Sequence, residues 1–151
     1  MLFRSGGWAE GYVNWCSTLG IVSGYGDGSF RPGNQVTAAE AATMILNALK
    51  VDAGEGTWPH TVMAKAEELD MFDDLSPKPA NDQALTREEL AVMALVGLEY
   101  SPEGTTGYEY NGVVYDNYFD ALLIAGDASK ITPAAKDTLA STVYEMKTVE
   151  G

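Results

Sequence analysis

The chain repeats part of its own sequence, and this repeat limits the folds open to it. Residues 36–40, VTAAE, return 49 residues later as LTREE at 85–89, and Trp8 returns 50 residues later as Trp58. Repeats with a period of about 20–50 residues are typical of chains built from small units that bury a core only by packing on one another. We therefore expect repeated supersecondary units rather than one continuous pattern.

Each unit has the pattern of helix, loop and helix. The first helices carry apolar residues every three or four positions, namely Trp8, Tyr12, Trp15 and Leu19 in one unit and Trp58, Met63, Ala66 and Leu69 in the other. The second helices begin with Thr37-x-x-Glu40 and Thr86-x-x-Glu89, the capping-box pattern in which threonine and glutamate satisfy each other's main-chain N–H groups. Each second helix has an apolar face that we expect in the core: Ala41, Ile45 and Leu49 in one, and Leu90, Ala94 and Leu98 in the other.

The loop between the first two helices is unusually rich in glycine, with GYGDGSFRPG at residues 24–33. Gly20 stands where a helix commonly ends in a left-handed conformation, and the glycines at 24, 26 and 28 permit positive φ. Such a loop reverses the chain and turns main-chain N–H groups outward, which suits either a neighbouring segment or a ligand. The simplest interpretation is a turn that packs Tyr25 and Phe30 against the helix pair.

The remainder of the chain gives weaker signals. Residues 108–115, YEYNGVVY, predict a small β-hairpin, because Asn111-Gly112 suits the two positive-φ positions of a type I′ turn. Residues 116–125 and the segment that begins at Thr132-Pro133 have helical patterns compatible with a third unit. The sequence leaves open whether that unit exists.

Residues 8–49, with LGIVSGYGDGSFRPGNQVTAAEAATMILNAL, resemble an S-layer homology repeat, and residues 58–98, ending in LTREELAVMALVGL, resemble a second one with a worn loop. The resemblance implies an all-α fold of helix-loop-helix repeats packed as a pseudo-symmetric helical bundle. The expected organisation is a non-native adapter remnant at 1–5, repeats at 6–51 and 52–101, and the hairpin with a degenerate third repeat at 102–151.

In similar proteins, grooves between repeats bind secondary cell-wall polysaccharide, often bearing pyruvate ketals. The arginine after the capping threonine contacts the sugar carboxylate there, and only Arg87 fits this role, because Ala38 and Pro133 occupy the equivalent places. Helix N-termini in such grooves also offer N–H groups to an anion. The candidate ligand-binding residues are Arg87, Thr86, Trp8, Trp58, Gly26, Asp27, Gly28 and Arg31. Either tryptophan also suits a core position, and Arg87 also suits an ion pair with nearby carboxylates.

Other classes of function fit the sequence less well. The net charge of −13 argues against nucleic acid, and no apolar run is long enough to span a membrane. Cys16, the single cysteine, forms no internal disulfide and suits a buried position. Asp27-Gly28 invites a calcium-loop interpretation, but the neighbouring positions lack the alternating oxygen ligands. We expect no cofactor, no metal and no catalysis, because no set of reactive residues stands apart.

The chain is acidic, and the resemblance implies an extracellular module that anchors a protein to the bacterial cell wall through polysaccharide. Self-assembly of the parent protein is left open. The alternative is a structural spacer or protein-interaction module of a cell-surface protein that has lost sugar binding. Ala38 and Pro133 favour this alternative, and Arg87 opposes it.

Overall fold

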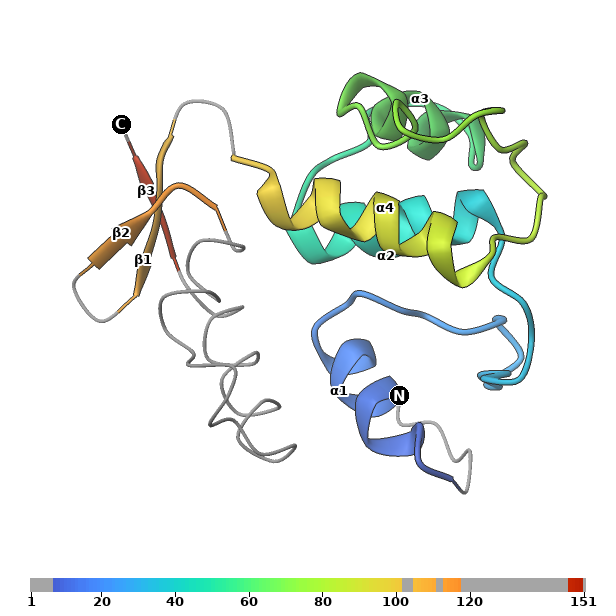
Figure 1. Cartoon of the computed structure of the whole chain (residues 1–151). Coiled ribbons are helices and arrows are strands. Elements are labelled where there is room, and N and C mark those ends of the chain that lie inside the picture. Colours follow the sequence, from blue (N-terminus) through green and yellow to red (C-terminus); the bar gives the residue numbers. More distant parts are fainter. Residues whose placement is uncertain (1–6, 102–104, 111–112, 118–146, 151) are drawn as a thin grey trace. The chain divides into compact units, whose positions relative to one another are not determined.

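The computed structural model describes residues 7–101, 105–110, 113–117 and 147–150, and the chain divides into two compact units, Met1–Gly97 and Leu98–Gly151 (Figure 1). The helices are α1 (Glu10–Thr18), α2 (Ala38–Leu49), α3 (His60–Glu68) and α4 (Arg87–Glu99). All four lie where the repeat pattern predicts them. The predicted helical class is confirmed for the first unit.

The second helix of each pair begins with the predicted capping box. The Glu40 N–H donates to Thr37 Oγ1 at 3.3 Å, and the Thr37 N–H donates to Glu40 Oε2 at 3.0 Å. The same two bonds join Thr86 and Glu89 at 3.2 and 2.8 Å. α1 and α3, in contrast, begin without a side-chain cap.

The first helix of each pair also ends in the same way. The residue after the C-cap is left-handed in both, with φ of 74° at Gly20 and 62° at Asp70. The next N–H then donates to a carbonyl five residues earlier, at 2.9 Å from Ile21 and 3.0 Å from Met71. Both bonds belong to the Schellman pattern, which closes a helix C-terminus. The two copies therefore share their hydrogen bonds at both ends of the loop.

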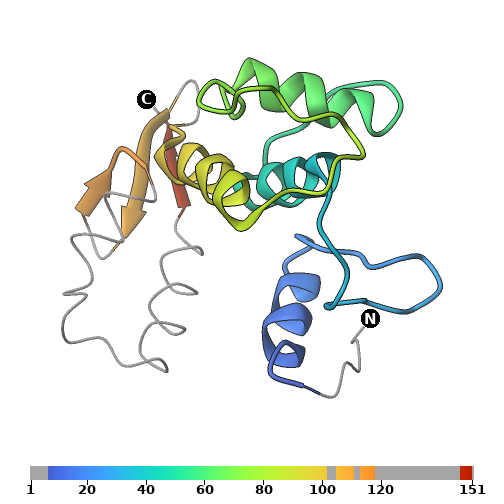
Figure 2. The same ribbon diagram turned by 45° about the vertical axis from the view of Figure 1, so that its right-hand side comes forward.

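The main core lies between α2, α3 and α4. α2 and α4 lie side by side in both views, and α3 packs over α2 (Figures 1 and 2). α4 comes close to α2 at Gly97, where an added Cβ would lie 2.8 Å from Ile45 Cγ2. The buried residues of this core are Ala38, Ala39, Ala41, Ala42, Leu46, Val62, Met63, Ala66, Met71, Phe72 and Met93.

The predicted core faces are correct only in part. Ala41 is fully buried, but Ile45 and Leu49 are half-buried at the edge of the cluster. In α4 the deepest residues are Met93 and Gly97 rather than the predicted leucine and alanine face. The apolar periodicity thus identified the helices. Which face of each helix is buried depends on how the helices pack against one another.

α1 lies apart from the other three helices in both views (Figures 1 and 2). Ala9 and Val13 pack against Phe30 in a separate small cluster. The aromatic side chains of the first predicted helix are exposed, with exposed fractions of 86% at Trp8, 54% at Tyr12 and 37% at Trp15. The core alternative for Trp8 is therefore not observed, because helical spacing reveals an apolar face but not what covers it.

Cys16, on the same helix, is half-buried rather than fully enclosed. This partial burial raises the pKa of its thiol by disfavouring the charged thiolate.

The segments that lead into α2 and α4 pair with each other. Thr37 and Ala84 form an antiparallel bridge, and the Leu85 N–H donates to the Val36 carbonyl at 2.9 Å. This short pairing fixes the start of one helix against the start of the other. It joins residues 47 or more positions apart, so no local pattern in the sequence indicates it.

The second unit contains a three-stranded antiparallel sheet of β1 (Thr105–Tyr110), β2 (Val113–Tyr115) and β3 (Lys147–Glu150), in the order β2-β1-β3 (Figure 1). Tyr108 pairs with Tyr115 and Tyr110 with Val113, so the predicted hairpin is confirmed. Strand β3 is not predicted by the sequence analysis. The predictions for residues 1–5, and for a third helical unit with Pro133, lie outside the described residues.

Candidate functional site

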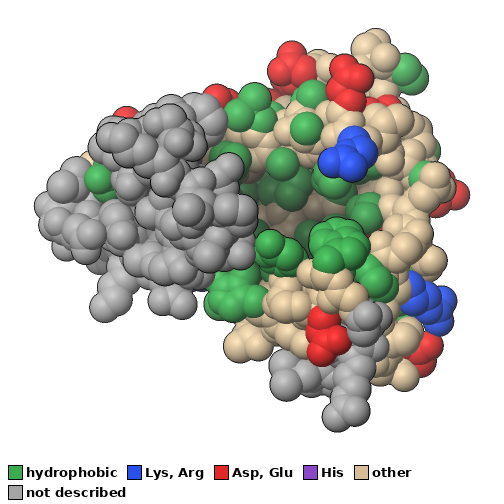
Figure 3. Space-filling view, turned by 60° about the horizontal axis from the view of Figure 1, so that its bottom comes forward, with side chains coloured by type: hydrophobic (Ala, Val, Ile, Leu, Met, Phe, Trp, Pro, Cys, Tyr) green, Lys and Arg blue, Asp and Glu red, His purple; other side chains and the backbone are tan. Residues whose placement is uncertain are grey.

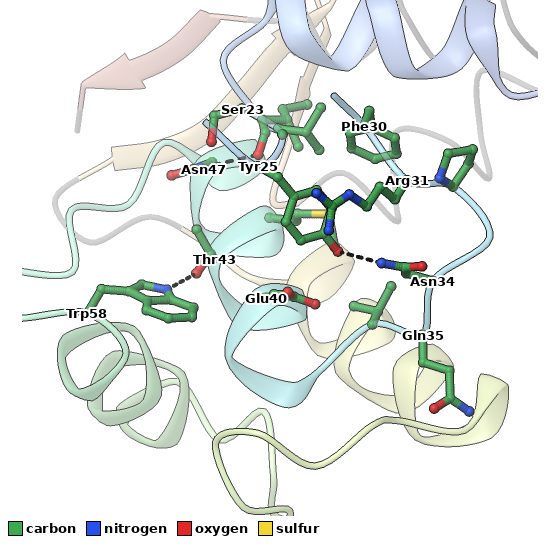
Figure 4. Close-up of a pocket in the computed structure, with 16 residues that line it drawn as sticks. Ser23, Tyr25, Phe30, Arg31, Asn34, Gln35, Glu40, Thr43, Asn47 and Trp58 are labelled. Carbon is green, nitrogen blue, oxygen red and sulfur yellow. Dashed lines mark hydrogen bonds between the residues drawn. The ribbon is translucent and has the colours of Figure 1, made fainter. Parts of the chain in front are cut away.

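A pocket of about 410 Å³ opens between the glycine-rich loop, α2 and the segment just before α3 (Figure 4). This volume is at the lower end of the range for small-molecule sites, about 300–1,000 Å³. Tyr25 and Arg31 line it from the loop, Glu40 and Thr43 from α2, and Trp58 from the beginning of the second copy. The pocket therefore joins residues of both predicted repeats.

Trp58 is held at the pocket by a relay of hydrogen bonds. Its Nε1–H donates to Thr43 Oγ1 at 3.0 Å, and the Thr43 hydroxyl donates to the Ala39 carbonyl at 2.7 Å. The indole remains 58% exposed, so its position does not come from burial. An indole fixed at one edge with its face accessible is a suitable platform for an apolar ring face.

The cation of the pocket is already paired. Arg31 Nη2 lies 3.0 Å from Asp27 Oδ2, and the guanidinium carbon lies 4.5 Å from the centre of the Tyr25 ring. Asp27 also accepts from the Ser29 hydroxyl at 2.6 Å and from the Ser29 N–H at 2.9 Å. These two bonds, with a further contribution from Arg31, lower the pKa of Asp27 to about 2.

The start of α2 has no unused N–H groups to offer an anion. The Ala38 and Ala39 N–H groups donate to the carbonyls of Gln83 and Asn81, each at 3.0 Å, and the Glu40 N–H is taken by the threonine cap. The expectation that this helix N-terminus serves an anion is therefore wrong. The second loop fills the places that an anion would occupy.

Thr86 and Arg87 stand at the start of α4, and neither lines the pocket. Arg87 is exposed, and among the described residues no carboxylate forms an ion pair with it. The alternative in which it pairs with a neighbouring glutamate is thus not observed. The main-chain N–H groups of Arg87 and Glu88 likewise donate to no residue that the structure describes. This helix start is more open than that of α2.

The structure thus brings together only some of the candidate residues. Trp58 and Arg31 both line the pocket. Asp27 does not line it but forms an ion pair with Arg31. Gly26 and Gly28 shape the loop with φ of 70° and 82° without lining the pocket. Trp8 is exposed away from it. Sequence reasoning missed Thr43, Tyr25, Glu40 and Asn47 as pocket residues.

The hydrogen bonds from Ser29 to Asp27 were also not predicted, although they had a local signal. Asp27 followed two residues later by Ser29 is a common pattern for a side chain that bonds its own backbone, so the local network around Arg31 was open to prediction. The contact from Trp58 to Thr43 spans 15 residues and two elements, and no local pattern indicates it.

The first unit also has a hollowed face on which hydrophobic side chains gather, with few charged groups among them (Figure 3). The large hydrophobic side chains that this unit exposes are Trp8, Tyr12, Trp15, Tyr25, Trp58 and Leu95. Within the part of the chain that the structure describes, no three metal-ligating side chains cluster, and no helix is long and apolar enough to cross a membrane.

Comparison with known proteins finds a family model that the first part of the chain matches. Residues 4–42 match the sequence model of the S-layer homology domain. The chain is 46% identical over 91 residues to the Middle cell wall protein of Brevibacillus brevis, which covers 60% of this chain and 8% of that protein. It is 46% identical over 69 residues to the Surface layer protein of Brevibacillus choshinensis, which covers 45% of this chain and 6% of that protein.

A longer match is found with the Cell surface protein of Thermoanaerobacter kivui, 28% identical over 145 residues, or 95% of this chain and 17% of that protein. The chain therefore spans less than a fifth of the length of each of these three relatives. All three are bacterial proteins of the cell wall or surface. The resemblance to the S-layer homology family is confirmed for residues 4–42. The names of these relatives agree with the predicted location at the bacterial cell surface or wall.

Proposed function

Because residues 4–42 match the S-layer homology domain, we propose that the chain is a non-catalytic module that anchors its parent protein to the bacterial cell wall by binding secondary cell-wall polysaccharide. The observation that carries this proposal is the pocket at which the loop of the first copy meets Trp58 of the second. A fixed, accessible indole beside hydroxyl, amide and carboxylate groups is the combination that a sugar requires, since a sugar has both an apolar ring face and hydroxyl groups.

The proposed organisation follows the recurring hydrogen bonds. Residues 6–51 and 52–101 are proposed as the two repeats, and their packing is the beginning of a pseudo-symmetric bundle. The pairing of Thr37 with Ala84 supports this arrangement, because it ties the second helix of one copy to that of the other. The remaining residues, 102–151, complete the module in this proposal.

Arg87 has a separate role in the proposed site. Its exposed guanidinium at the open start of α4 is available to a carboxylate on the polysaccharide, such as that of a pyruvate ketal. Charge-assisted hydrogen bonds of this type contribute about 1.5–3 kcal/mol each. Arg87 is the cation placed for this role, because Ala38, at the corresponding place in α2, is fully buried in the core.

The experiment is retention of the purified chain on immobilised wall polysaccharide. Wild type should be retained, and both Trp58→Ala and Arg87→Ala should reduce the affinity by about tenfold, which corresponds to about 1.4 kcal/mol. Lys78→Ala is the matched control for loss of a cation, because Lys78 is already paired with Glu67 at 2.6 Å. Retention of all variants at the wild-type level would contradict the proposed site.

The second candidate is a spacer or protein-interaction module, and the buried Ala38 and the exposed aromatic side chains of α1 favour it. It predicts that the wild-type chain does not bind wall polysaccharide at all, while it still contributes to the stability or contacts of the parent protein. Failure of the wild type to bind polysaccharides from several walls, with its fold verified by circular dichroism, would select this candidate.

A further inference from the structure

The charges around the pocket indicate what kind of sugar it takes. Resting on the proposed function, we infer that the pocket between Trp58 and the glycine-rich loop selects an uncharged sugar ring over a ring that bears a carboxylate. Any charged ring of the same polymer is then left to Arg87, outside the pocket. The inference follows from three observations.

The first observation is the balance of charge. Arg31 and Glu40 are the charged residues that line the pocket. Arg31 is neutralised by Asp27 at 3.0 Å and stacks over Tyr25 (Figure 4). Glu40 uses one carboxylate oxygen to cap α2 and carries its negative charge at the pocket wall. Because Asp27 offsets the charge of Arg31, the charge of Glu40 leaves this region net negative, and that disfavours a carboxylate ligand.

The second observation is that main-chain donors are unavailable here. An anion at the start of a helix is normally held by its first N–H groups. In α2, the groups of Ala38 and Ala39 are taken by carbonyls of the second loop, and that of Glu40 by Thr37. The pocket thus lacks both an unpaired cation and a set of unused helix N–H groups among the described residues.

The third observation is that the pocket does offer groups that suit a neutral sugar. Trp58 presents an indole face whose edge is fixed by Thr43 (Figure 4). Glu40 and Gln35 are both lining residues of the pocket, and no described residue bonds the second oxygen of Glu40 or the amide of Gln35. Hydroxyl groups can donate to the carboxylate oxygen and accept from the amide.

The test compares one wall polysaccharide that bears pyruvate ketals with the same polymer after mild acid removal of the ketals. Size-exclusion chromatography verifies that the polymer chain is intact. Affinities are measured by titration calorimetry at about 20 mM salt, where charge effects are weakly screened. The full chain carries Arg87→Ala, so that the cation outside the pocket does not set the preference.

We expect the ketal-free polymer to bind at least as tightly as the charged one, with about a threefold advantage. Glu40→Gln should shift the ratio of the two affinities toward the charged polymer by about three- to tenfold, since glutamine preserves the capping box while removing the charge. Glu89→Gln is the matched control, because it makes the same change in the other capping box, outside the pocket, and should leave the ratio unchanged.

Tighter binding of the charged polymer, by more than about threefold in the Arg87→Ala chain, would overturn the inference while leaving polysaccharide anchoring in place. An affinity ratio that Glu40→Gln shifts no more than Glu89→Gln would overturn it as well. If the wild-type chain binds neither polymer, the proposed function itself fails, and that result is distinct from a preference for the charged form.

Discussion

The two helix-loop-helix copies share their helix caps and helix ends but use their side chains differently. In the second copy, α3 and the loop after it fill the core, and Met63, Met71 and Phe72 are buried. In the first copy, α1 buries only Val13, beside its N-cap residue Ala9, and the loop after it lines a pocket. The same backbone pattern therefore supports a core in one copy and an accessible surface in the other.

The residues directly after the first helix of each copy illustrate the difference. Met71 and Phe72 are buried, whereas Ile21 and Val22, 50 positions earlier, are half-buried and line the pocket. Further along, the second loop contains the buried Pro79, whereas the first contains the glycines at 24, 26 and 28. The two loops thus differ in side-chain volume and also in backbone, since those three glycines have positive φ and the second loop has no counterpart to them.

The largest expected difference between the copies is in stability. Met93→Ala removes a fully buried side chain from α4 and should lower the free energy of unfolding by about 2–5 kcal/mol. Met44→Ala, at the matching position of α2, faces the pocket and should cost about 1 kcal/mol. Urea unfolding followed by circular dichroism measures both, and equal losses would contradict the assignment of core to one copy and surface to the other.

The matched tryptophans should differ in binding. Trp58→Ala should weaken binding of wall polysaccharide by about tenfold, because the indole forms a wall of the pocket. Trp8→Ala, 50 positions earlier and outside the pocket, should change the affinity by less than about threefold. Calorimetric titration of both variants measures this contrast. A larger loss from the Trp8 substitution would move the site to α1.

The caps should respond alike, in contrast to the cores. Thr37→Ala and Thr86→Ala each remove the acceptor for an N3 amide and should lower the free energy of unfolding by about 1 kcal/mol. Serine at either position keeps the hydroxyl and should restore most of the loss. Unequal effects, measured by denaturant unfolding, would show that the shared hydrogen bonds do not have the same weight in both copies.

The smallest effect is the response of the first loop to acid. The pKa of Asp27 falls from about 3.8 to about 2 in the folded chain, so the folded state favours the ionised carboxylate. The contribution of ionised Asp27 to the free energy of unfolding is complete above about pH 5 and is lost as the pH falls toward 2. NMR titration of the Asp27 carboxyl carbon measures this midpoint, and the Asp27→Asn variant should lose the accompanying shift at Ser29. A midpoint near 4 would contradict the described network.

The predictions that succeeded depend on residues close together in the chain. The Thr-x-x-Glu starts of α2 and α4 and the left-handed Gly20 are local features, and the structure contains all of them. The hairpin at 108–115 was predicted for the same reason, because its two strands are joined by a two-residue turn sequence. Hydrogen bonds between residues close together in the chain can therefore be predicted from the sequence pattern.

The predictions that failed depend on contacts between distant segments. The core alternative for Trp8 is not observed, since helical spacing does not tell which neighbour covers a face. The start of α2 was expected to hold an anion, but the carbonyls of Asn81 and Gln83 occupy its N–H groups. The relay from Trp58 to Thr43 was missed because it joins the two copies across the pocket.

The carbonyls of Asn81 and Gln83 have a consequence for how such chains are divided or recombined. Separating the two copies would remove two acceptors from α2 and leave the Ala38 and Ala39 N–H groups with only water as a partner. We therefore expect the first copy to be less stable when it is transferred to another protein without the second copy. Gene fusions and evolutionary exchange should preserve the pair, because part of what completes the earlier copy is encoded in the later one.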